Sequence, residues 1–528
     1  MTIPGALAKA ADTFGDDDAI IEGQRRLSFA ELHDLAAQAA QAVSASGILP
    51  GDRVALWAPN AWEWIVASFG VYAAGAVLVP LNTRFKSDEA AHVLRTSGAR
   101  LLLTVTDFLG ADFVGMVQAR SDLPRLQEIV VLRGPARQGT IAWEDWLERG
   151  AATDSSATHA RSRAVEGIST SDIIFTSGTT GAPKGAVLTH GASVRTYSVW
   201  SSLVGLRQDD RYLVVYPFFH TAGLKSGILA SVLTGCAIIP FPVFDVPAVM
   251  ACVAEQRISV LPGPPTVFQS ILNHPDFDRF DLSSLRLSVT GAATVPVEII
   301  RRMREELKFE SVVTGYGLTE TTGTVSMCQH DDPPEVIATT VGRPLPGVEV
   351  RVVDEVGLAL PSGEPGEILV RGFNVMKEYF RDAEATRSTI DPSGWLHTGD
   401  IGILGNDGNL RITDRKKDMF ICGGFNVYPA EVEGIIVRHP SVAQVSVIGV
   451  PDARMGEIGI AFVILRHEEP WDPKAFLEWC RDNMANYKAP RGVQVVDAFP
   501  LNPSGKVMKF HLRAQAATSG AWPTTTEG

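Results

Sequence analysis

This sequence of 528 residues has few cysteines, no excess of positive charge and few long apolar runs. Its five cysteines are odd in number and widely scattered, which disfavours a disulfide framework or a cysteine-based metal site and predicts reduced structural thiols. The formal net charge of −13 disfavours nucleic acid as a partner, because a polyphosphate backbone would be repelled. The longest apolar stretch, residues 64–81, is interrupted by two glycines and Pro80. It therefore predicts a buried helix followed by a strand rather than an integral membrane segment.

The amino-terminal residues give no indication of export. Residues 1–18 contain one lysine and an acidic run, and they lack an apolar segment of signal-peptide length. We therefore expect a cytoplasmic protein. With 45% hydrophobic and 20% charged residues the composition is that of a globular protein, and the length is sufficient for several domains.

Apolar residues alternate between helical spacing and short strand-like runs over most of the chain. Residues 29–43 follow a helical period, residues 53–57 form a short apolar run, and similar segments recur after residue 172. This alternation is typical of layered domains, so we predict an α/β fold. The predicted parts are a large N-terminal domain of two layered α/β subdomains over residues 1–414, with a linker at about 150–170 and a small β-rich subdomain at about 341–414, a hinge at 415–418, a mobile α+β C-terminal lid domain at 419–514 and a disordered tail at 515–528.

A loop rich in glycine and hydroxyl groups follows the strand expected at residues 172–176. Its sequence is Thr176-Ser177-Gly178-Thr179-Thr180-Gly181-Ala182-Pro183-Lys184-Gly185. Backbone N–H groups and hydroxyls of such a loop can surround phosphate oxygens, while the Lys184 ammonium offsets their charge. The loop is not a P-loop, because only two residues separate Gly178 from Gly181.

The loop resembles the signature of the adenylate-forming superfamily, which comprises acyl-CoA synthetases, luciferases and the adenylation modules of peptide synthetases. Further motifs similar to those of the family occur in the same order up to residue 506. The resemblance implies an ATP-dependent acyl-CoA synthetase, an acid–thiol ligase that converts a carboxylic acid to its acyl-adenylate and then to a CoA thioester. It implies ATP, Mg²⁺ and coenzyme A as cofactor and co-substrates. An adenylation module that loads a carrier protein is the alternative.

The run Thr314-Gly315-Tyr316-Gly317-Leu318-Thr319-Glu320-Thr321 resembles the family's adenine and magnesium motif. The resemblance implies that Tyr316 stacks on adenine, that Thr319 touches the α-phosphate, and that Glu320, together with Thr176, binds Mg²⁺. A flat aromatic ring suits a purine, and Mg²⁺ prefers hard oxygen ligands with several waters retained.

Two further segments resemble the family's ribose-binding motifs. Asp400 matches the carboxylate that accepts both ribose hydroxyls, and Arg415 matches a contact to the same sugar. The nucleotide-binding residues implied by the resemblance are Thr176, Ser177, Gly178, Thr179, Thr180, Gly181, Lys184, Gly291, Ala292, Ala293, Thr314, Gly315, Tyr316, Gly317, Asp400, Ile412 and Arg415.

The run from Pro217 to Gly223 resembles the family's acid-pocket motif, in which His220 gates the acyl carboxylate. The motif lacks the aspartate of relatives that activate amino acids, which disfavours an amino-acid substrate. Lys225 follows the motif on an expected helix, and it is either a solvated surface lysine or a contact to a second polar group of the acid. The pocket residues implied are His220, Thr221, Lys225, Gly291 and Gly315.

The C-terminal part carries a lysine that resembles the family's mobile catalytic residue, Lys506. A carboxylate that attacks a phosphate meets like-charge repulsion, so a lysine is useful at this step. The catalytic residues implied are Lys506, Glu320, Thr319 and His220. Lys417 matches the family's hinge, and Gly423, Gly424 and Phe425 are expected to face the pantetheine arm of CoA. We also hypothesise that Lys506 is a target of acetylation.

The nature of the acid is suggested by a narrower resemblance. Residues 219–227 and 290–293 are similar to actinobacterial synthetases that act on the bicyclic propanoate left by steroid ring degradation. A medium- or long-chain fatty acid is the competing substrate, and it would require a long apolar tunnel. The partners expected are therefore the small carboxylic acid, ATP and CoA, together with a second copy of the chain in a homodimer.

Overall fold

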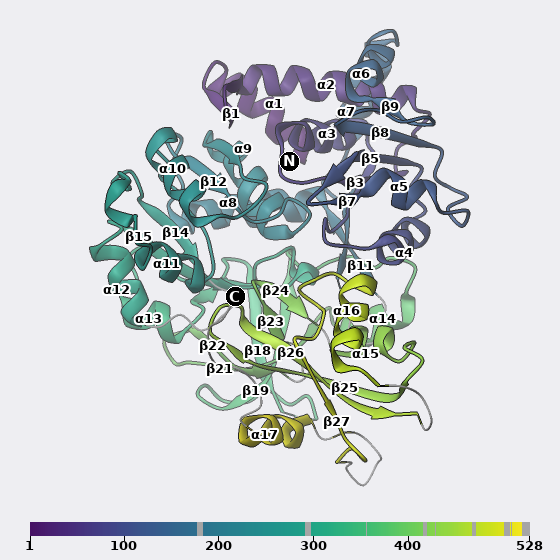
Figure 1. Cartoon of the computed structure of the whole chain (residues 1–528). Helices are drawn as coiled ribbons and strands as arrows, with labels where there is room; N and C mark the ends of the chain where they lie inside the picture. Colours follow the sequence, from purple (N-terminus) through teal and green to yellow (C-terminus); the bar gives the residue numbers. More distant parts are fainter. Residues whose placement is uncertain are drawn as a thin grey trace. The chain divides into compact units, whose positions relative to one another are not determined.

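The structure is a computed structural model, and it divides the chain into two compact units (Figure 1). It describes residues 1–176, 183–290, 297–354, 356–415, 420–427, 429–466, 471–500, 507 and 509–519. The first unit comprises Met1–Thr83, Ala90–Phe175 and Gly185–Thr413, and the second comprises Arg84–Glu89, Thr176–Lys184 and Asp414–Gly528. The mixed α/β architecture predicted from the sequence is confirmed. Among the described residues, no helix is both long and apolar enough to cross a membrane.

The first unit contains an eight-stranded sheet in the order β20-β11-β10-β4-β3-β5-β8-β9. The strands are β3 (Arg53–Trp57), β4 (Val77–Pro80), β5 (Leu101–Val105), β8 (Glu128–Arg133), β9 (Ile141–Ala142), β10 (Thr170–Thr176), β11 (Lys184–Thr189) and β20 (Glu378–Tyr379). Pairing is parallel from β10 through β9, and β11 pairs antiparallel with β20. The central strands β4 and β5 are buried along their whole length. Such continuous apolar runs suit parallel strands that are covered on both faces.

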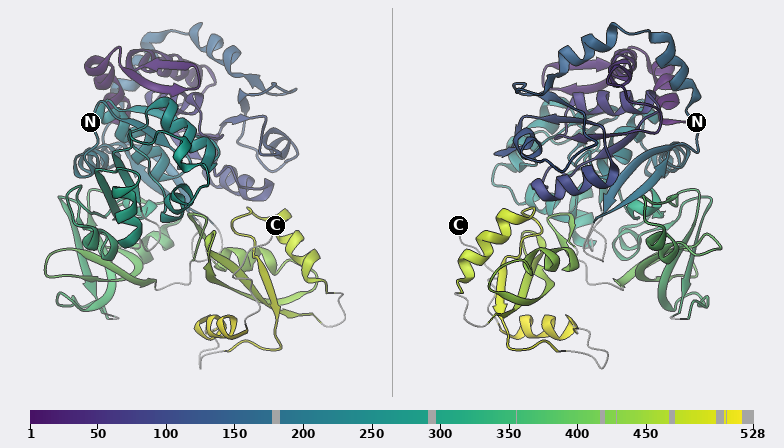
Figure 2. Two further views of the ribbon diagram at one scale, coloured as in Figure 1. Left: turned by 60° about the vertical axis from the view of Figure 1, so that its left-hand side comes forward. Right: turned by 90° about the vertical axis from the view of Figure 1, so that its right-hand side faces the viewer.

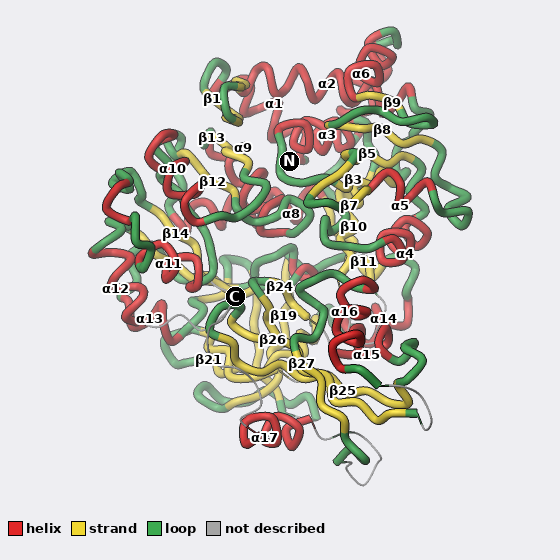
Figure 3. The backbone as a smooth tube through the Cα atoms, in the orientation of Figure 1, coloured by secondary structure: helices red, strands yellow, loops and turns green. Residues whose placement is uncertain are grey.

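Helices alternate with these strands along the sequence (Figure 3). They are α1 (Ile3–Phe14), α2 (Phe29–Ala45), α3 (Trp62–Ala73), α4 (Ser87–Ser97), α5 (Phe113–Gln118), α6 (Trp143–Ala151) and α7 (Ser155–Ala164). A capping box between Ser28 and Glu31 starts α2. Helix α3 is buried from Glu63 to Tyr72 and precedes β4, which confirms the buried helix and strand expected at residues 64–81.

The expected linker at about 150–170 is largely the helix α7. Its sequence lacks large apolar residues, and only Thr158 is buried. The Asp154 side chain caps the first turn by accepting from Ser156 N–H, and Arg161 donates to the carbonyl of Ile48 at 2.9 Å. Capping and long-range hydrogen bonds from Arg161 to Ser44 and Ile48 thus stabilise a helix that apolar periodicity could not predict.

A second group of strands lies near the motifs expected to bind nucleotide and acid. They are β1 (Asp18–Glu22), β2 (Arg25–Ser28), β12 (Arg211–Val214), β13 (Ala237–Pro240), β14 (Leu287–Thr290), β15 (Ser311–Tyr316), β16 (Ser326–Met327) and β17 (Arg343–Pro344). Val260 bridges Tyr212 of β12 and Leu287 of β14 in parallel. The accompanying helices are α8 (His190–Val204), the π-helix η1 (Ala222–Leu229), α9 (Ala230–Thr234), α10 (Val246–Gln256), α11 (Pro265–Leu272), α12 (Val297–Glu305), the 3₁₀-helix η3 (Thr319–Thr321) and α13 (Pro334–Thr339).

An antiparallel sheet follows, in the order β18-β19-β21-β22. Its strands are β18 (Val348–Val353), β19 (Pro365–Gly372), β21 (Leu396–Leu404) and β22 (Leu410–Arg415), and α14 (Ala383–Thr389) lies between β20 and β21 in sequence. This sheet accounts for the β-rich composition after residue 341.

The second unit is an α+β structure around one twisted sheet (Figure 2). Its elements are β23 (Phe420–Cys422), β24 (Phe425–Val427), α15 (Pro429–Ile436), β25 (Val442–Asp452), β26 (Gly456–Leu465), α16 (Pro473–Asn483), β27 (Gly492–Val495) and α17 (Lys509–Ser519). The two faces of the sheet have separate cores. Val447 packs with residues of α15 and α16, whereas its neighbour Ile448 packs with Leu512 and Ala516 of α17.

Helix α17 corrects the expected disordered tail, because residues 515–519 are helical. Leu512 and Ala516 are four residues apart and therefore share one face of the helix. Both are buried against the sheet of the second unit. The sequence suggested disorder because the residues are small and polar, whereas this single apolar contact is enough to extend the helix.

Candidate nucleotide and acid site

Tyr316 and Asp400, which were expected to bind adenine and ribose, lie in contact in the first unit. Tyr316 ends β15, Asp400 lies in β21, and the phenol donates a hydrogen bond to Asp400 Oδ2 at 2.6 Å. The carboxylate is 7% exposed. Its backbone N–H donates to Thr398 Oγ1 at 3.1 Å. A hydrogen bond to an ionised carboxylate is comparatively strong, so the phenol fixes the orientation of Asp400.

Glu320 and Thr319 lie on η3, directly after the glycine-rich end of β15. Thr319 is largely buried, and Tyr379 of β20 donates its hydroxyl to Glu320 Oε1 at 2.7 Å. Met376 N–H donates to the carbonyl of Glu320 at 2.7 Å. Sequence reasoning missed Tyr379, which is separated from Glu320 by 59 positions and carries no motif that the sequence analysis identified. Its partner strand β11 begins at Lys184, the end of the glycine and threonine loop.

The glycines around η3 permit close packing that a side chain would prevent. A Cβ at Gly315 would lie 2.3 Å from Met327 Sδ, and one at Gly317 would lie 2.2 Å from the carbonyl oxygen of Gly323. A Cβ at Gly323, where φ is +93°, would meet Tyr197 Oη at 2.5 Å and Thr221 Cβ at 3.0 Å. The acid-pocket motif therefore packs directly against the turn that follows Glu320.

His220 and Thr221 lie in the turn between β12 and η1. The His220 N–H donates to the carbonyl of Pro217 at 3.0 Å, and His220 Nδ1 accepts from Ala222 N–H at 3.2 Å. Nδ1 is thereby an acceptor, which assigns the proton of the neutral ring to Nε2. His220 is exposed to solvent at this turn, and partial desolvation by the surrounding protein atoms lowers its pKa below the ordinary value. The imidazole is therefore neutral at pH 7.

Lys225 is the clearest correction to the expected site. The prediction of a solvated surface lysine is wrong, because its side chain is 1% exposed. Its ammonium binds Asp172 of β10 at 2.5 Å, and Tyr72 also donates to that carboxylate. Burial lowers the pKa of Lys225, and the negative charge of Asp172 opposes this shift. Since the ammonium is held by Asp172, a direct contact between Lys225 and the acid stays a prediction.

Several expected residues lie outside the described part of the chain, and their roles stay predictions. They are residues 177–181, residues 291–293, Lys417 and Lys506, and the side chain of Arg415. Thr176 and Lys184 flank the glycine and threonine loop, and Thr176 Oγ1 donates to the carbonyl of Lys184 at 3.5 Å. Thr314 is buried on β15, and Ile412 is half-buried on β22.

The turn expected to face CoA lies between β23 and β24 in the second unit. Gly423 and Gly424 have φ values of +58° and +82°, a conformation that glycine adopts without strain. The Phe425 ring stacks on Tyr487 with centroids 4.5 Å apart. Burial raises the pKa of Cys422 to about 11, so its thiol is protonated and a poor nucleophile at pH 7. All five cysteines are free, as predicted.

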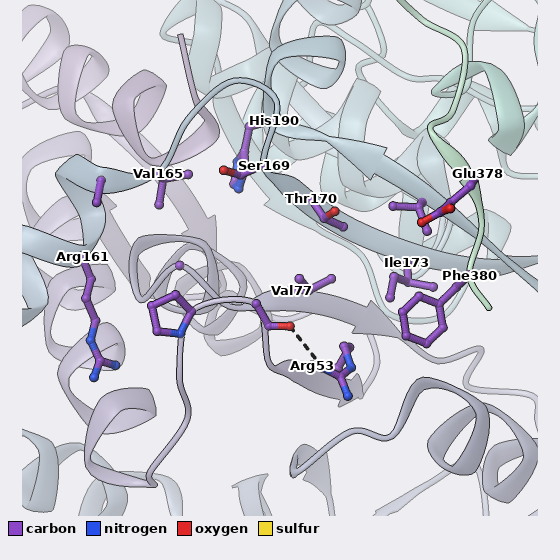
Figure 4. A pocket seen from close by; sticks show the side chains of 15 residues that line it. Arg53, Val77, Arg161, Val165, Ser169, Thr170, Ile173, His190, Glu378 and Phe380 are labelled. Atoms are coloured by element: carbon purple, nitrogen blue, oxygen red, sulfur yellow. Dashed lines mark hydrogen bonds between the residues drawn. The ribbon is translucent and has the colours of Figure 1, made fainter.

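A pocket of about 430 Å³ lies at the amino-terminal ends of parallel strands of the eight-stranded sheet (Figure 4). Arg53, Val77 and Thr170 line it, and they stand at the starts of β3, β4 and β10. Ligands of open parallel sheets bind beyond the carboxyl ends of the strands, which is the opposite end. Arg53 already donates to the carbonyls of Ser97 and Gly51. The residues that line this pocket include none of those expected to bind nucleotide or acid.

Comparisons with known proteins agree with this geometry. Residues 7–380 match the AMP-binding enzyme family and residues 431–506 match the AMP-binding enzyme C-terminal domain. The chain therefore belongs to the AMP-binding enzyme family, and its acyl-CoA synthetase resemblance is confirmed.

Two relatives are similar along nearly their entire length. The chain is 46% identical over 518 residues to the 3-[(3aS,4S,7aS)-7a-methyl-1,5-dioxo-octahydro-1H-inden-4-yl]propanoyl:CoA ligase of Rhodococcus jostii (strain RHA1), covering 97% of this chain and 98% of the relative. It is also 46% identical over 512 residues to the Mycobacterium tuberculosis (strain ATCC 25618 / H37Rv) ligase of the same name, with the same coverage. The solved Mycobacterium tuberculosis fatty acyl CoA synthetase is 32% identical, with a TM-score of 0.71 over 98% of this chain and 99% of that one.

Proposed function

We propose that the acid activated by this AMP-forming acyl-CoA synthetase is a bicyclic dioxo-indenyl propanoate. The observation that supports this substrate is the identity of 46% along 97% of the chain to two ligases named for it. The fatty acyl CoA synthetase of known structure is less similar, at 32%. A fatty acid is therefore the less favoured substrate.

In the proposed first step a carboxylate oxygen of the acid attacks the α-phosphorus of ATP. The bond to the β-phosphate breaks, and pyrophosphate leaves with its electron pair. Asp400 accepts the ribose hydroxyls, and Tyr316 provides the flat surface for adenine. The hydrogen bond from Tyr316 orients the Asp400 carboxylate proposed to bind the ribose.

The residues present fit Mg²⁺ held mainly by phosphates and water. Among the described residues no group of three or more His, Cys, Asp or Glu side chains forms a metal cage. Mg²⁺ retains several waters and needs few protein carboxylates, and Glu320 supplies one hard oxygen donor whose partner oxygen is held by Tyr379. When bound, Mg²⁺ offsets the negative charge that develops on the phosphates. Lys506 is proposed to neutralise the charge of the attacking carboxylate, so acetylation would stop this step.

In the second step the CoA sulfur attacks the acyl carbon of the adenylate. A C–S bond forms, the thiol proton passes to solvent, the C–O bond to AMP breaks, and AMP leaves with the electron pair of that bond. We assign Gly423 and Gly424 to the passage of the pantetheine arm, because glycines leave room beside a narrow ligand. The second unit is proposed to rotate about Lys417 between the two steps. A cytoplasmic homodimer completes the proposal, and light scattering of the purified chain tests its oligomeric state.

A panel of acids tests the proposal. The full-length chain is incubated with ATP, Mg²⁺ and either the bicyclic propanoate, hexadecanoate or an aromatic acid, with and without CoA, and pyrophosphate and thioester are measured. We expect the highest kcat/KM for the bicyclic acid and a CoA-dependent thioester. A tenfold preference for hexadecanoate would contradict the substrate, whereas adenylate without any thioester would favour carrier loading. Lys506→Ala is the control variant that separates enzymatic pyrophosphate release from background hydrolysis.

A further inference from the structure

The interior of the first unit contains a group of charged and polar side chains that the proposed reaction does not use. Lys225 Nζ lies 2.5 Å from Asp172 Oδ2, and the two side chains are 1% and 0% exposed. Ser171 Oγ donates to the same oxygen at 2.6 Å, and the Tyr72 hydroxyl donates to Oδ1. The carboxylate therefore connects three elements: its own strand β10, helix α3 through Tyr72, and the π-helix η1 through Lys225.

Stability alone does not explain this ion pair. Removing two charges from water is costly, and replacing a buried ion pair by apolar side chains of similar volume is often neutral or stabilising. Leu224 and Ile228 of η1 are buried, so this helix already presents apolar side chains to the interior. We therefore expect the ion pair to determine the position of η1.

The π-helix η1 packs closely against β12 and the turn that follows it. A Cβ at Gly223 would lie 2.2 Å from the carbonyl oxygen of Pro217, and a Cβ at Gly227 would lie 2.6 Å from Val214 Cγ1. These glycines let η1 lie close to β12, and Lys225 extends from between them toward β10. π-helical segments are rare and are frequently found at functional sites.

One end of the ion pair lies near the acid-pocket motif, and the other lies near the glycine and threonine loop. Lys225 is four positions after Thr221, which packs against Gly323 after the Glu320 turn. Asp172 is four positions before Thr176, where β10 ends and the glycine and threonine loop begins. A displacement of η1 along β10 would therefore move the acid-pocket motif relative to the strand that leads into that loop.

We propose that Asp172 and Lys225 are positioning residues that set the alignment of the acid with the α-phosphate of ATP. The pair fixes the π-helix η1 to the strand β10. Helix η1 begins at the end of the acid-pocket motif, and β10 leads into the glycine and threonine loop. This positioning role requires no contact between either side chain and substrate. The inference rests on the proposed roles of His220 and of the loop at residues 177–181. A misplacement of about 1 Å can lower a rate by about a hundredfold, so a small shift of η1 is sufficient.

The test replaces the whole group with apolar side chains of similar size, Tyr72→Phe, Asp172→Leu and Lys225→Met in one variant. We measure thermal unfolding, binding of a non-hydrolysable ATP analogue without acid, and ATP–pyrophosphate exchange with whichever acid the wild-type chain adenylates. The expected result is a folded protein that binds the analogue within about twofold of wild type, with kcat for exchange at least about tenfold lower and KM for the acid raised. The single variant Lys225→Arg, which keeps the positive charge beside Asp172, should have a higher rate of exchange than the triple variant.

Asp210 and Arg286 provide the matched control. They form a second buried pair in the first unit, with side chains 4% and 11% exposed, and neither belongs to η1 or β10. Asp210→Leu with Arg286→Met should leave KM for the acid unchanged.

Wild-type kcat and KM in the folded triple variant would overturn the proposal and leave the ion pair a purely structural role. If the triple variant does not fold, Asp172→Asn with Lys225→Met removes both charges and the link to η1 while the amide oxygen can still accept from Tyr72. Unchanged kinetics in that variant would overturn the proposal equally. Because the acid is one that the wild-type chain already adenylates, failure of the proposed bicyclic substrate does not affect this outcome.

Discussion

Lys225→Met alone should be strongly destabilising, because it leaves the Asp172 carboxylate buried without its cation. Breaking a buried ion pair by removing one partner costs about 3–5 kcal/mol. Tyr72 and Ser171 still donate to Asp172 in this variant, so we expect the lower end of the range, about 3 kcal/mol. The triple apolar variant should instead lie within about 1 kcal/mol of wild type, since no charge is left unpaired.

The free energy of unfolding in urea supplies the test of this reasoning. Urea unfolding followed by fluorescence of buried tryptophans such as Trp64 compares wild type, Lys225→Met and the triple apolar variant at pH 7.5. A deficit of Lys225→Met below about 1 kcal/mol, or one no larger than that of the triple variant, would refute this reasoning.

The remaining predictions concern single side chains. Tyr379→Phe removes the hydrogen-bond donor to Glu320, and it should raise the Mg²⁺ concentration for half-maximal activity about fivefold, the equivalent of one hydrogen bond. Direct binding of Mn²⁺ is the second measurement, and an unchanged Mn²⁺ affinity would contradict this prediction. His190 is 1% exposed and lies near Tyr72, Asp172 and Lys225, and burial lowers its pKa to about 4. The unfolded state therefore binds one more proton than the folded state between pH 6.5 and 4, so stability is lost as pH falls through this range. His190→Gln should remove up to about 3 kcal/mol of that loss in urea titrations, and an identical pH profile would disprove the assignment. Lys506→Ala should slow adenylate formation by about a hundredfold or more while sparing thioester formation from supplied acyl-adenylate, and equal losses in both steps would exclude the proposed role.

Much of the fold could be predicted because its signals are local. The strands at residues 53–57, 172–176 and 287–290 are short apolar runs bounded by turn residues, and the structure contains β3, β10 and β14 there. The contact between Tyr316 and Asp400 joins two residues that the motifs had already selected. Each of these conclusions depends on patterns within about ten residues of sequence.

The features that sequence reasoning missed depend on long-range partners. Lys225 was taken for a solvated or substrate-facing side chain, because nothing near it indicates that Asp172, 53 positions earlier, is its partner. Tyr379 lies in a two-residue strand whose role emerges only when β20 pairs with β11. Residues 515–519 are small or polar, and they continue a helix whose Leu512 and Ala516 pack on a sheet formed by other segments.

A competition experiment tests the proposed substrate and the CoA ligase activity together. Equal concentrations of the bicyclic dioxo-indenyl propanoate and hexadecanoate are offered to the full-length chain with ATP, Mg²⁺ and limiting CoA, and both thioesters are measured by mass spectrometry. We expect the bicyclic acyl-CoA to dominate and AMP to form in equal amount to the thioester. Predominant hexadecanoyl-CoA would contradict the proposed substrate, and the absence of both thioesters despite ATP consumption would contradict the assignment as a CoA ligase.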